Sequence, residues 1–144
     1  MADDLQSSVA DRLRRVGQRH TSGRRILIDA LARAGRPLTA AELVAAEERL
    51  PQSTTYRNLA LLEQAGVVHR VTGTDDFARF ELAEELTEHH HHLMCTACGQ
   101  VLDVTPSQEF EEITARMVGE LSAASAFTPV SHALDVFGRC AGCS

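Results

Sequence analysis

The sequence has no long hydrophobic run. No apolar stretch approaches the roughly 20 residues that a helix needs to cross a bilayer, and residues 1–15 lack the apolar centre of a secretion signal. We therefore expect a cytoplasmic protein with no membrane partner. The chain has 144 residues, of which 44% are hydrophobic, so it can form one ordinary domain or two small ones.

The signatures of catalytic zinc enzymes are also missing. The chain contains no His-Glu-x-x-His motif and no His-x-Glu paired with Pro-Cys-x-x-Cys. Internal repeats and low-complexity tracts are absent as well. We therefore expect a protein that is not an enzyme.

The charge is unevenly distributed along the chain. The net charge of −6 on its own argues against a nucleic-acid partner. However, residues 1–71 carry 11 arginines against 8 acidic residues, whereas residues 72–144 carry 3 arginines against 12 acidic residues. A solvated helix face would also explain the basic cluster, so charge alone leaves DNA binding open. Six of the arginines fall within fourteen residues that contain no acid: Arg12, Arg14, Arg15, Arg19, Arg24 and Arg25.

The first half of the chain has the pattern of a winged helix-turn-helix domain. Apolar spacings of three and four predict helices over residues 3–16 and from Thr21 or Ser22 to Gly35. Thr39-Ala-Ala-Glu42 is a capping box that opens a third helix to about residue 49, and Ser53 is a suitable N-cap for a fourth over residues 54–65. Residues 67–71 and 77–82 then predict a β-hairpin.

The second half has the pattern of a small α/β domain, which makes the whole chain α+β. Strands are expected over residues 100–104 and 129–138, on either side of a helix from Pro106 to about residue 124. The short polar segment before the histidine run predicts a hinge. The expected organisation is therefore a DNA-binding domain at residues 1–83, a hinge at 84–88 and a metal-binding dimerisation domain at 89–144.

Four cysteines form two Cys-x-x-Cys pairs. Four thiolates are the usual ligand set of a tetrahedral structural Zn²⁺. A redox role is the alternative, but neither pair lies at the strand-to-helix turn of a thioredoxin-like unit. The sequence therefore predicts a structural zinc site at Cys95, Cys98, Cys140 and Cys143.

Four consecutive histidines, residues 89–92, stand directly before the first cysteine pair. In an extended segment successive side chains point to opposite sides, so the run divides into two pairs. His90 and His92 would face one way, and His89 and His91 the other. A solvated loop or a purification tag is the alternative, but the internal position beside a cysteine pair favours two metal sites.

Together these motifs resemble the ferric uptake regulator family in order and spacing, over nearly the whole chain. The resemblance rests on the segments Thr54-Thr55-Tyr56-Arg57-Asn58-Leu59, Gly66-Val67-Val68 and Phe80-Glu81-Leu82, the histidine run, Cys95-x-x-Cys98-Gly99, His132 and Cys140-x-x-Cys143.

The resemblance implies two metal sites besides the cysteine site. A regulatory site would use His90 and His92 with a carboxylate from the wing, for which Glu81 fits, and His69 as the fourth ligand. His69 is alternatively an ordinary wing histidine. Two extra residues between Glu81 and the histidine run leave Glu84 and Glu85 open as the carboxylate. The other face would form an accessory site from His89, His91, Glu111 and His132.

The sensed metal is left open by the ligand types. Pro37 stands where some iron-responsive members have a histidine, and the segment in which many zinc sensors place a cysteine has none. Imidazole and carboxylate accept Zn²⁺, Fe²⁺ and Mn²⁺ alike. We therefore expect structural Zn²⁺ together with a regulatory Zn²⁺ or Fe²⁺, with Mn²⁺ as a further option.

The implied function is metal-dependent repression of metal-homeostasis genes by a homodimer on a palindromic double-stranded operator. A peroxide sensor of the same fold and a zinc module that binds no DNA are the alternatives. For Tyr56, packing in the apolar core is the alternative to DNA contact. The residues expected to touch DNA lie at the start of the fourth helix and ahead of the second: Ser53, Thr54, Tyr56, Arg57, Arg19 and Arg24.

Overall fold

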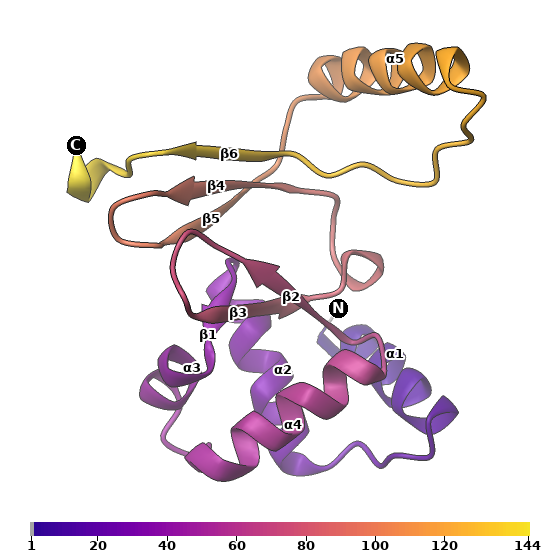
Figure 1. The fold of residues 1–144 in the computed structure, drawn as a ribbon. Coiled ribbons are helices and arrows are strands. Elements are labelled where there is room, and N and C mark those ends of the chain that lie inside the picture. The colour runs from indigo at the N-terminus through magenta and orange to yellow at the C-terminus, as the bar shows by residue number, and fades with distance from the viewer. Residues whose placement is uncertain (1) are drawn as a thin grey trace.

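Four helices of the N-terminal half enclose one apolar core in the computed structural model, which describes residues 2–144 (Figure 1). The predicted stripes face inward: Leu13, Leu27, Leu43 and Leu62 are fully buried. The amphipathic spacing of each helix therefore decides which of its faces is buried. The helices are α1 (Ala2–Arg15), α2 (Ser22–Ala34), α3 (Ala40–Ala46) and α4 (Gln52–Gln64).

Side-chain caps define where two of these helices begin. The Thr21 hydroxyl accepts the N–H of Arg24, and Thr39 and Glu42 form the predicted capping box at α3. The expected Ser53 cap is wrong. Helix α4 begins two residues earlier than predicted, at Gln52, and its N-cap Pro51 makes no side-chain cap hydrogen bond. The Pro51 carbonyl instead accepts both the N–H and the hydroxyl of Thr55.

Helix α3 is shorter than expected. It ends at Ala46 because Glu47 has an extended backbone, with φ −134° and ψ 104°. The Glu47 carboxylate then accepts hydrogen bonds from the backbone and guanidinium of Arg49, which close a turn before α4. Local side-chain to backbone bonds therefore compete with the last helical turn.

A three-stranded antiparallel sheet completes the N-terminal unit. The strand order is β1-β3-β2, and the pair β2–β3 is the predicted wing hairpin. His69 lies directly opposite Glu81 in the ladder. The N-terminal unit is therefore a winged helix, with strands β1 (Leu38–Thr39), β2 (Val68–Thr72) and β3 (Ala78–Leu82).

The C-terminal unit is a second three-stranded sheet with one long helix. The order is β5-β4-β6, with β4–β5 antiparallel and β4–β6 parallel. The last strand is shorter than predicted: it begins at Asp135, and of residues 129–134 only Leu134 is reached by β4, through the N–H of His92. The elements of this unit are β4 (His91–Cys95), β5 (Val101–Val104), α5 (Gln108–Ala124), β6 (Asp135–Gly138) and η2 (Ala141–Cys143). The short helix η1 (Glu84–Leu86) precedes them and packs on the N-terminal unit through Leu86.

Helix α5 stands apart from its own sheet (Figure 1). The helix itself was predicted, but its apolar stripe is not covered by this chain. The exposed fractions of Phe110, Ile113, Met117 and Leu121 range from 40% to 71%. Strand β6 is similarly open, with Phe137 60% exposed.

The two units touch along the wing. Val71 of β2 forms a buried apolar cluster with Met94 and Val101 of the second sheet. In the wing turn, the Thr74 hydroxyl donates to the carbonyl of Cys95 at 2.7 Å. Within residues 2–144, no helix has the length and apolar character required to cross a membrane.

We predict that Thr39→Ala lowers the free energy of unfolding by about 1 kcal/mol, because the N–H of Glu42 loses its acceptor. Urea denaturation of the zinc-loaded protein, followed by circular dichroism, measures this. Thr39→Ser keeps the hydroxyl and should retain most of the stability. Equal losses in the two variants would show that the cap contributes nothing.

Candidate metal centres and DNA-reading helix

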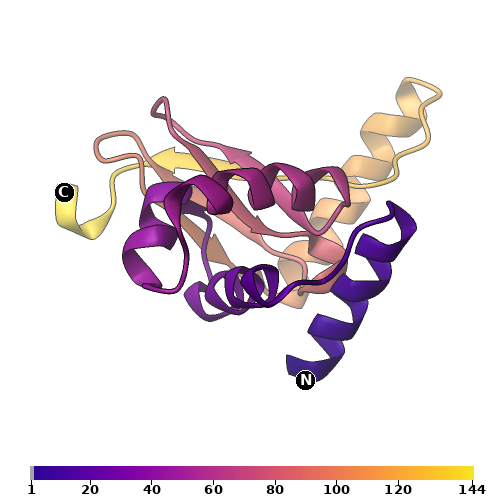
Figure 2. The ribbon, with the colours of Figure 1, turned by 90° about the horizontal axis from the view of Figure 1, so that it is seen from below.

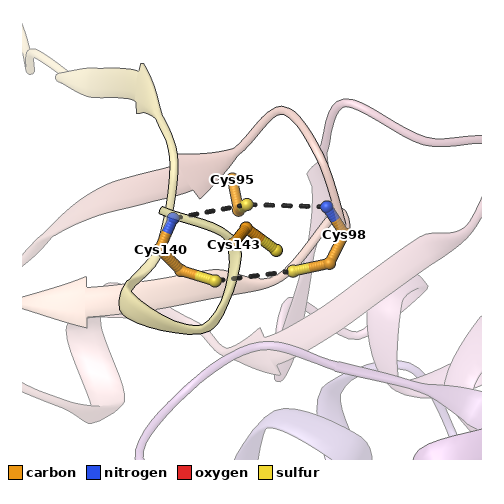
Figure 3. A group of neighbouring side chains, drawn as sticks. All are labelled: Cys95, Cys98, Cys140 and Cys143. Atoms are coloured by element: carbon orange, nitrogen blue, oxygen red, sulfur yellow. Dashed lines mark hydrogen bonds between the residues drawn. The ribbon is translucent and has the colours of Figure 1, made fainter.

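The four cysteines converge at one end of the second sheet (Figure 3). Cys95 ends β4, and Cys140 directly precedes η2. The four Sγ atoms lie within 4.8 Å of one another, and none is in a disulfide. The Cys95 Sγ accepts the backbone N–H groups of Cys140 at 3.4 Å and Cys98 at 3.5 Å. Strand pairing between β4 and β6 therefore brings the two knuckles together.

The electrostatics of this group fit a bound cation. Backbone N–H groups, first that of Cys140 and then that of Cys98, lower the pKa of Cys95 to about 6. The pKa of Cys143 is raised to about 12, first by its hydrogen bond with Cys140 and then by that with Cys98. Four thiols this close cannot all ionise without a compensating positive charge. Zn²⁺ supplies that charge for four thiolates.

The wing turn packs directly on the first cysteine knuckle. Gly99 has φ +78°, and a Cβ at this position would lie 2.0 Å from the Oδ2 of Asp75. Arg79 holds that carboxylate with two hydrogen bonds of 2.6 and 2.9 Å. Glycine at position 99 therefore permits both the left-handed turn and the close approach of the wing.

Glu81 lies between two histidines of the other unit. Its carboxylate is buried on β3, 3.0 Å from the Nε2 of His90 and 3.0 Å from the Nε2 of His92. The alternation of the extended segment points both imidazoles to this side, as predicted. One carboxylate of the winged helix thus bridges two imidazoles of the C-terminal unit.

Asp103, and not the predicted His69, is the fourth residue beside Glu81, His90 and His92. Asp103 is paired with His92 in the β4–β5 ladder, so its side chain shares the face of His92. Donor atoms of Glu81, His90, His92 and Asp103 lie within 4.8 Å of one another. His69 is exposed and is not in this group, although it lines a pocket of about 240 Å³ together with Glu81, His90 and His92.

The proposed regulatory group is prepared for a cation. The hydrogen bond to Glu81 is the main reason that the pKa of His92 is raised to about 9. Burial, followed by repulsion from Glu81, raises the pKa of Asp103 to about 6. Burial also opposes ionisation of Glu81. The hydrogen bond from His92 and the nearby imidazolium charges together outweigh this effect, so the pKa of Glu81 is lowered.

Outer partners orient both imidazoles. The Nδ1 of His92 lies 3.1 Å from the Oδ1 of Asp135, and the Nδ1 of His90 donates to the carbonyl of Glu88 at 2.9 Å. In each ring the Nε2 therefore faces the group. This is the arrangement that second-shell acceptors impose on metal-binding histidines. Sequence reasoning missed Asp103 and Asp135, because both depend on strand register.

The opposite face of the histidine run forms the expected accessory group. The Nε2 of His91 lies 2.7 Å from Glu111, while those of His132 and His89 lie 3.3 and 3.4 Å from it. The Nε2 atoms of His89 and His132 are buried without a hydrogen-bond partner. Buried polar atoms that converge unsatisfied are a sign of a site suited to a cation.

The two alternative hinge carboxylates are outside the donor group, although both line the pocket that Glu81, His90 and His92 share. Glu84 hydrogen-bonds to His89 of the accessory group, and Glu85 is exposed. Neither belongs to the donor group around His90 and His92. Glu81 is therefore the wing carboxylate that the structure brings to these histidines.

Helix α4 presents a polar face to solvent. Figure 2 shows α4 across the near side of the molecule. Tyr56 is 53% exposed, which rules out its core alternative, whereas Thr55 and Leu59 are buried. The Nε of Arg24 donates to Asn58 of α4 at 3.1 Å, and Arg24 also donates to the carbonyl of Arg19. The exposed residues of the predicted set are Ser53, Thr54, Tyr56, Arg57 and Arg19.

Comparison with known proteins decides the family. The sequence model of the ferric uptake regulator family matches residues 15–137. The chain belongs to this family. It is a metal-responsive transcription regulator, and the predicted fold class is confirmed by structural similarity to the Helicobacter pylori ferric uptake regulator. That structure has a TM-score of 0.76 and 22% identity, with coverage of 99% of this chain and 93% of the other.

Two further relatives are similar over most of the chain. The peroxide operon regulator of Bacillus subtilis is 28% identical, over 99% of this chain and 95% of its own length. The structure of a ferric uptake regulator from Pseudomonas aeruginosa with manganese has a TM-score of 0.65 and is 28% identical. The match covers 90% of this chain and 95% of the other.

We predict that Mn²⁺ affinity at the His90–His92 group rises about tenfold per pH unit between pH 7 and 9, then levels off. The reason is that His92, with its pKa raised to about 9, must release a proton to bind a metal. Below about pH 6 protonation of Asp103 should weaken binding further.

Chelator competition under anaerobic conditions measures this affinity. A His132→Ala background removes one accessory donor and so limits binding on the other face. A flat profile from pH 7 to 9 would contradict the predicted proton release.

Proposed function

We propose that the protein is a cytoplasmic repressor of metal-homeostasis genes that binds a palindromic operator as a homodimer when its regulatory metal is bound. The observation that carries this proposal is the position of Glu81. It belongs to the winged helix, whereas His90, His92 and Asp103 belong to the other unit. A cation held by all four would fix the angle between the two units.

The DNA-binding half of the proposal rests on α4. In helix-turn-helix proteins the second helix of the motif enters the major groove with its N-terminal residues at the base edges. Ser53, Thr54, Tyr56 and Arg57 lie at that end of α4, exposed. Arg57 offers a guanidinium fork to a base or phosphate, and Tyr56 an apolar ring face to thymine methyl groups. Arg19 and Arg24 are placed to contact the sugar-phosphate backbone.

The dimer is supported by uncovered apolar surface. Phe110, Ile113 and Met117 of α5 are exposed together with Val136 and Phe137 of β6. Apolar patches of this kind mark interaction surfaces. A second copy of the chain would cover them and set the distance between two α4 helices to match successive major grooves.

The proposed metals follow from the donors. Four thiolates at Cys95, Cys98, Cys140 and Cys143 suit structural Zn²⁺. Two imidazoles and two carboxylates suit Fe²⁺ or Mn²⁺ as well as Zn²⁺ at the regulatory group of Glu81, His90, His92 and Asp103. The accessory group of His89, His91, Glu111 and His132 is proposed as a third site.

A peroxide-sensing repressor is the second candidate. Two of the similar relatives are named for this response: the Bacillus subtilis regulator and the peroxide-responsive repressor PerR of Staphylococcus aureus, which is 27% identical over 97% of this chain. The regulatory group of two imidazoles and two carboxylates suits the Fe²⁺ that such a sensor would use, and His90 and His92 would then be the ligands that peroxide oxidises.

We predict that regulatory metal increases operator affinity between about 5-fold and 150-fold, the usual range of allosteric coupling. An anaerobic gel-shift titration of metal-stripped protein with Zn²⁺, Fe²⁺ or Mn²⁺, with structural zinc retained, measures this. His90→Ala should abolish the metal dependence, whereas His69→Ala, outside the donor group, should keep it. Metal-independent binding by the unmodified protein would refute the proposal.

We predict for the second candidate that Fe²⁺-loaded protein exposed to hydrogen peroxide gains one oxygen atom on His90 or His92 and releases DNA. Peptide mass spectrometry locates the oxygen. Mn²⁺-loaded protein is the matched control, because the Mn²⁺ form should not support the reaction. Unmodified histidines after release of DNA would exclude this candidate.

A further inference from the structure

Glu84 connects the accessory group to the winged helix. It is the first residue of η1, which begins two residues after the end of β3. Its Oε1 atom hydrogen-bonds to the Nδ1 of His89. The Nε2 of the same ring points the other way, towards Glu111, and is buried without a hydrogen-bond partner.

This contact determines which ring nitrogen of His89 can bind a cation. A carboxylate accepts a hydrogen bond, so the proton of the neutral ring resides on Nδ1. The lone pair is then on Nε2, which faces Glu111 and stands close to His132, with the two ring centroids 5.0 Å apart. The carboxylate also raises the basicity of the ring.

Helix η1 is held by the N-terminal unit. The N–H of Ala83 donates to the carbonyl of Val67 at 2.9 Å, and Leu86 packs against the core of the winged helix. His91, Glu111 and His132 belong to the C-terminal unit. The hydrogen bond between Glu84 and His89 therefore crosses from one unit to the other.

We propose that Glu84 is a positioning residue for the accessory site, and that it makes occupancy of this site a second input to the arrangement of the two domains. The domain-coupling part rests on the proposed function, whereas the metal-affinity part does not. A cation at the accessory group draws His89 towards Glu111 and His132. Through Glu84, the same cation holds η1 and the attached wing against the C-terminal unit.

The chain offers a matched control beside the residue under test. Glu85 is also in η1 and exposed, but it has no hydrogen bond to a histidine among the described residues. Substitution at either position changes the net charge equally. A general electrostatic effect on Zn²⁺ affinity would therefore appear in the variants at both positions, whereas an effect of the hydrogen bond would appear only at Glu84.

The first experiment measures Zn²⁺ affinity at the accessory site by chelator competition. It uses the full chain with structural zinc retained and His90→Ala to disable the regulatory group. We predict that Glu84→Ala weakens binding about 10-fold to 100-fold. The Zn²⁺ affinity of Glu84→Gln should lie between those of the parent and Glu84→Ala, because the amide oxygen still accepts the hydrogen bond but lacks the charge.

Glu85→Ala and Glu85→Gln should bind Zn²⁺ as the His90→Ala parent does. Thermal melts of the metal-free variants separate positioning from folding, because a merely structural residue would lower the melting temperature without a specific loss of Zn²⁺ affinity. Unchanged affinity in Glu84→Ala, or an equal loss in Glu85→Ala, would overturn the proposal.

The second experiment tests the coupling in protein with an intact regulatory group saturated with Mn²⁺. Added Zn²⁺ should increase operator affinity of the unmodified chain and of Glu85→Ala, but not of Glu84→Ala. An equal increase in Glu84→Ala would refute the coupling. If no form binds DNA, the proposed function fails, while the Zn²⁺ affinities still decide the role of Glu84.

Discussion

The alternation of side chains along residues 89–92 is the constraint on which the rest of the molecule depends. A single extended segment points His90 and His92 to one face and His89 and His91 to the other. Each pair meets a carboxylate from a different element, Glu81 on β3 and Glu111 on α5. The two donor groups therefore share one backbone segment, and both depend on the position of the same strand.

Burial of Glu81 makes the contact between the units sensitive to charge. Without a cation, the buried carboxylate is compensated by the imidazoles of His90 and His92, which keep its pKa low despite desolvation. The regulatory metal proposed here would replace those protons with a more concentrated charge that also engages Asp103.

The wing is held at a second point by the cysteine knuckle. The Thr74 hydroxyl bonds to the carbonyl of Cys95, and Asp75 occupies the space above Gly99. The structural Zn²⁺ proposed for the four thiolates would therefore stabilise both the C-terminal fold and the surface on which the wing rests. Two contacts, at the tip and at the base of the wing, define the relative position of the units.

Local patterns in the sequence were sufficient for the helices, the wing hairpin, the cysteine pairs and the division of the histidines, because each depends on residues only a few positions apart. The capping box at Thr39 and Glu42 is of this kind. Tertiary structure alone decided that Asp103 and Asp135 reach His92, because the pairings of β4 with β5 and β6 are set by long-range packing. It also decided that His69 stays outside the donor group and that Glu84 reaches His89, since a hinge conformation cannot be derived from periodicity.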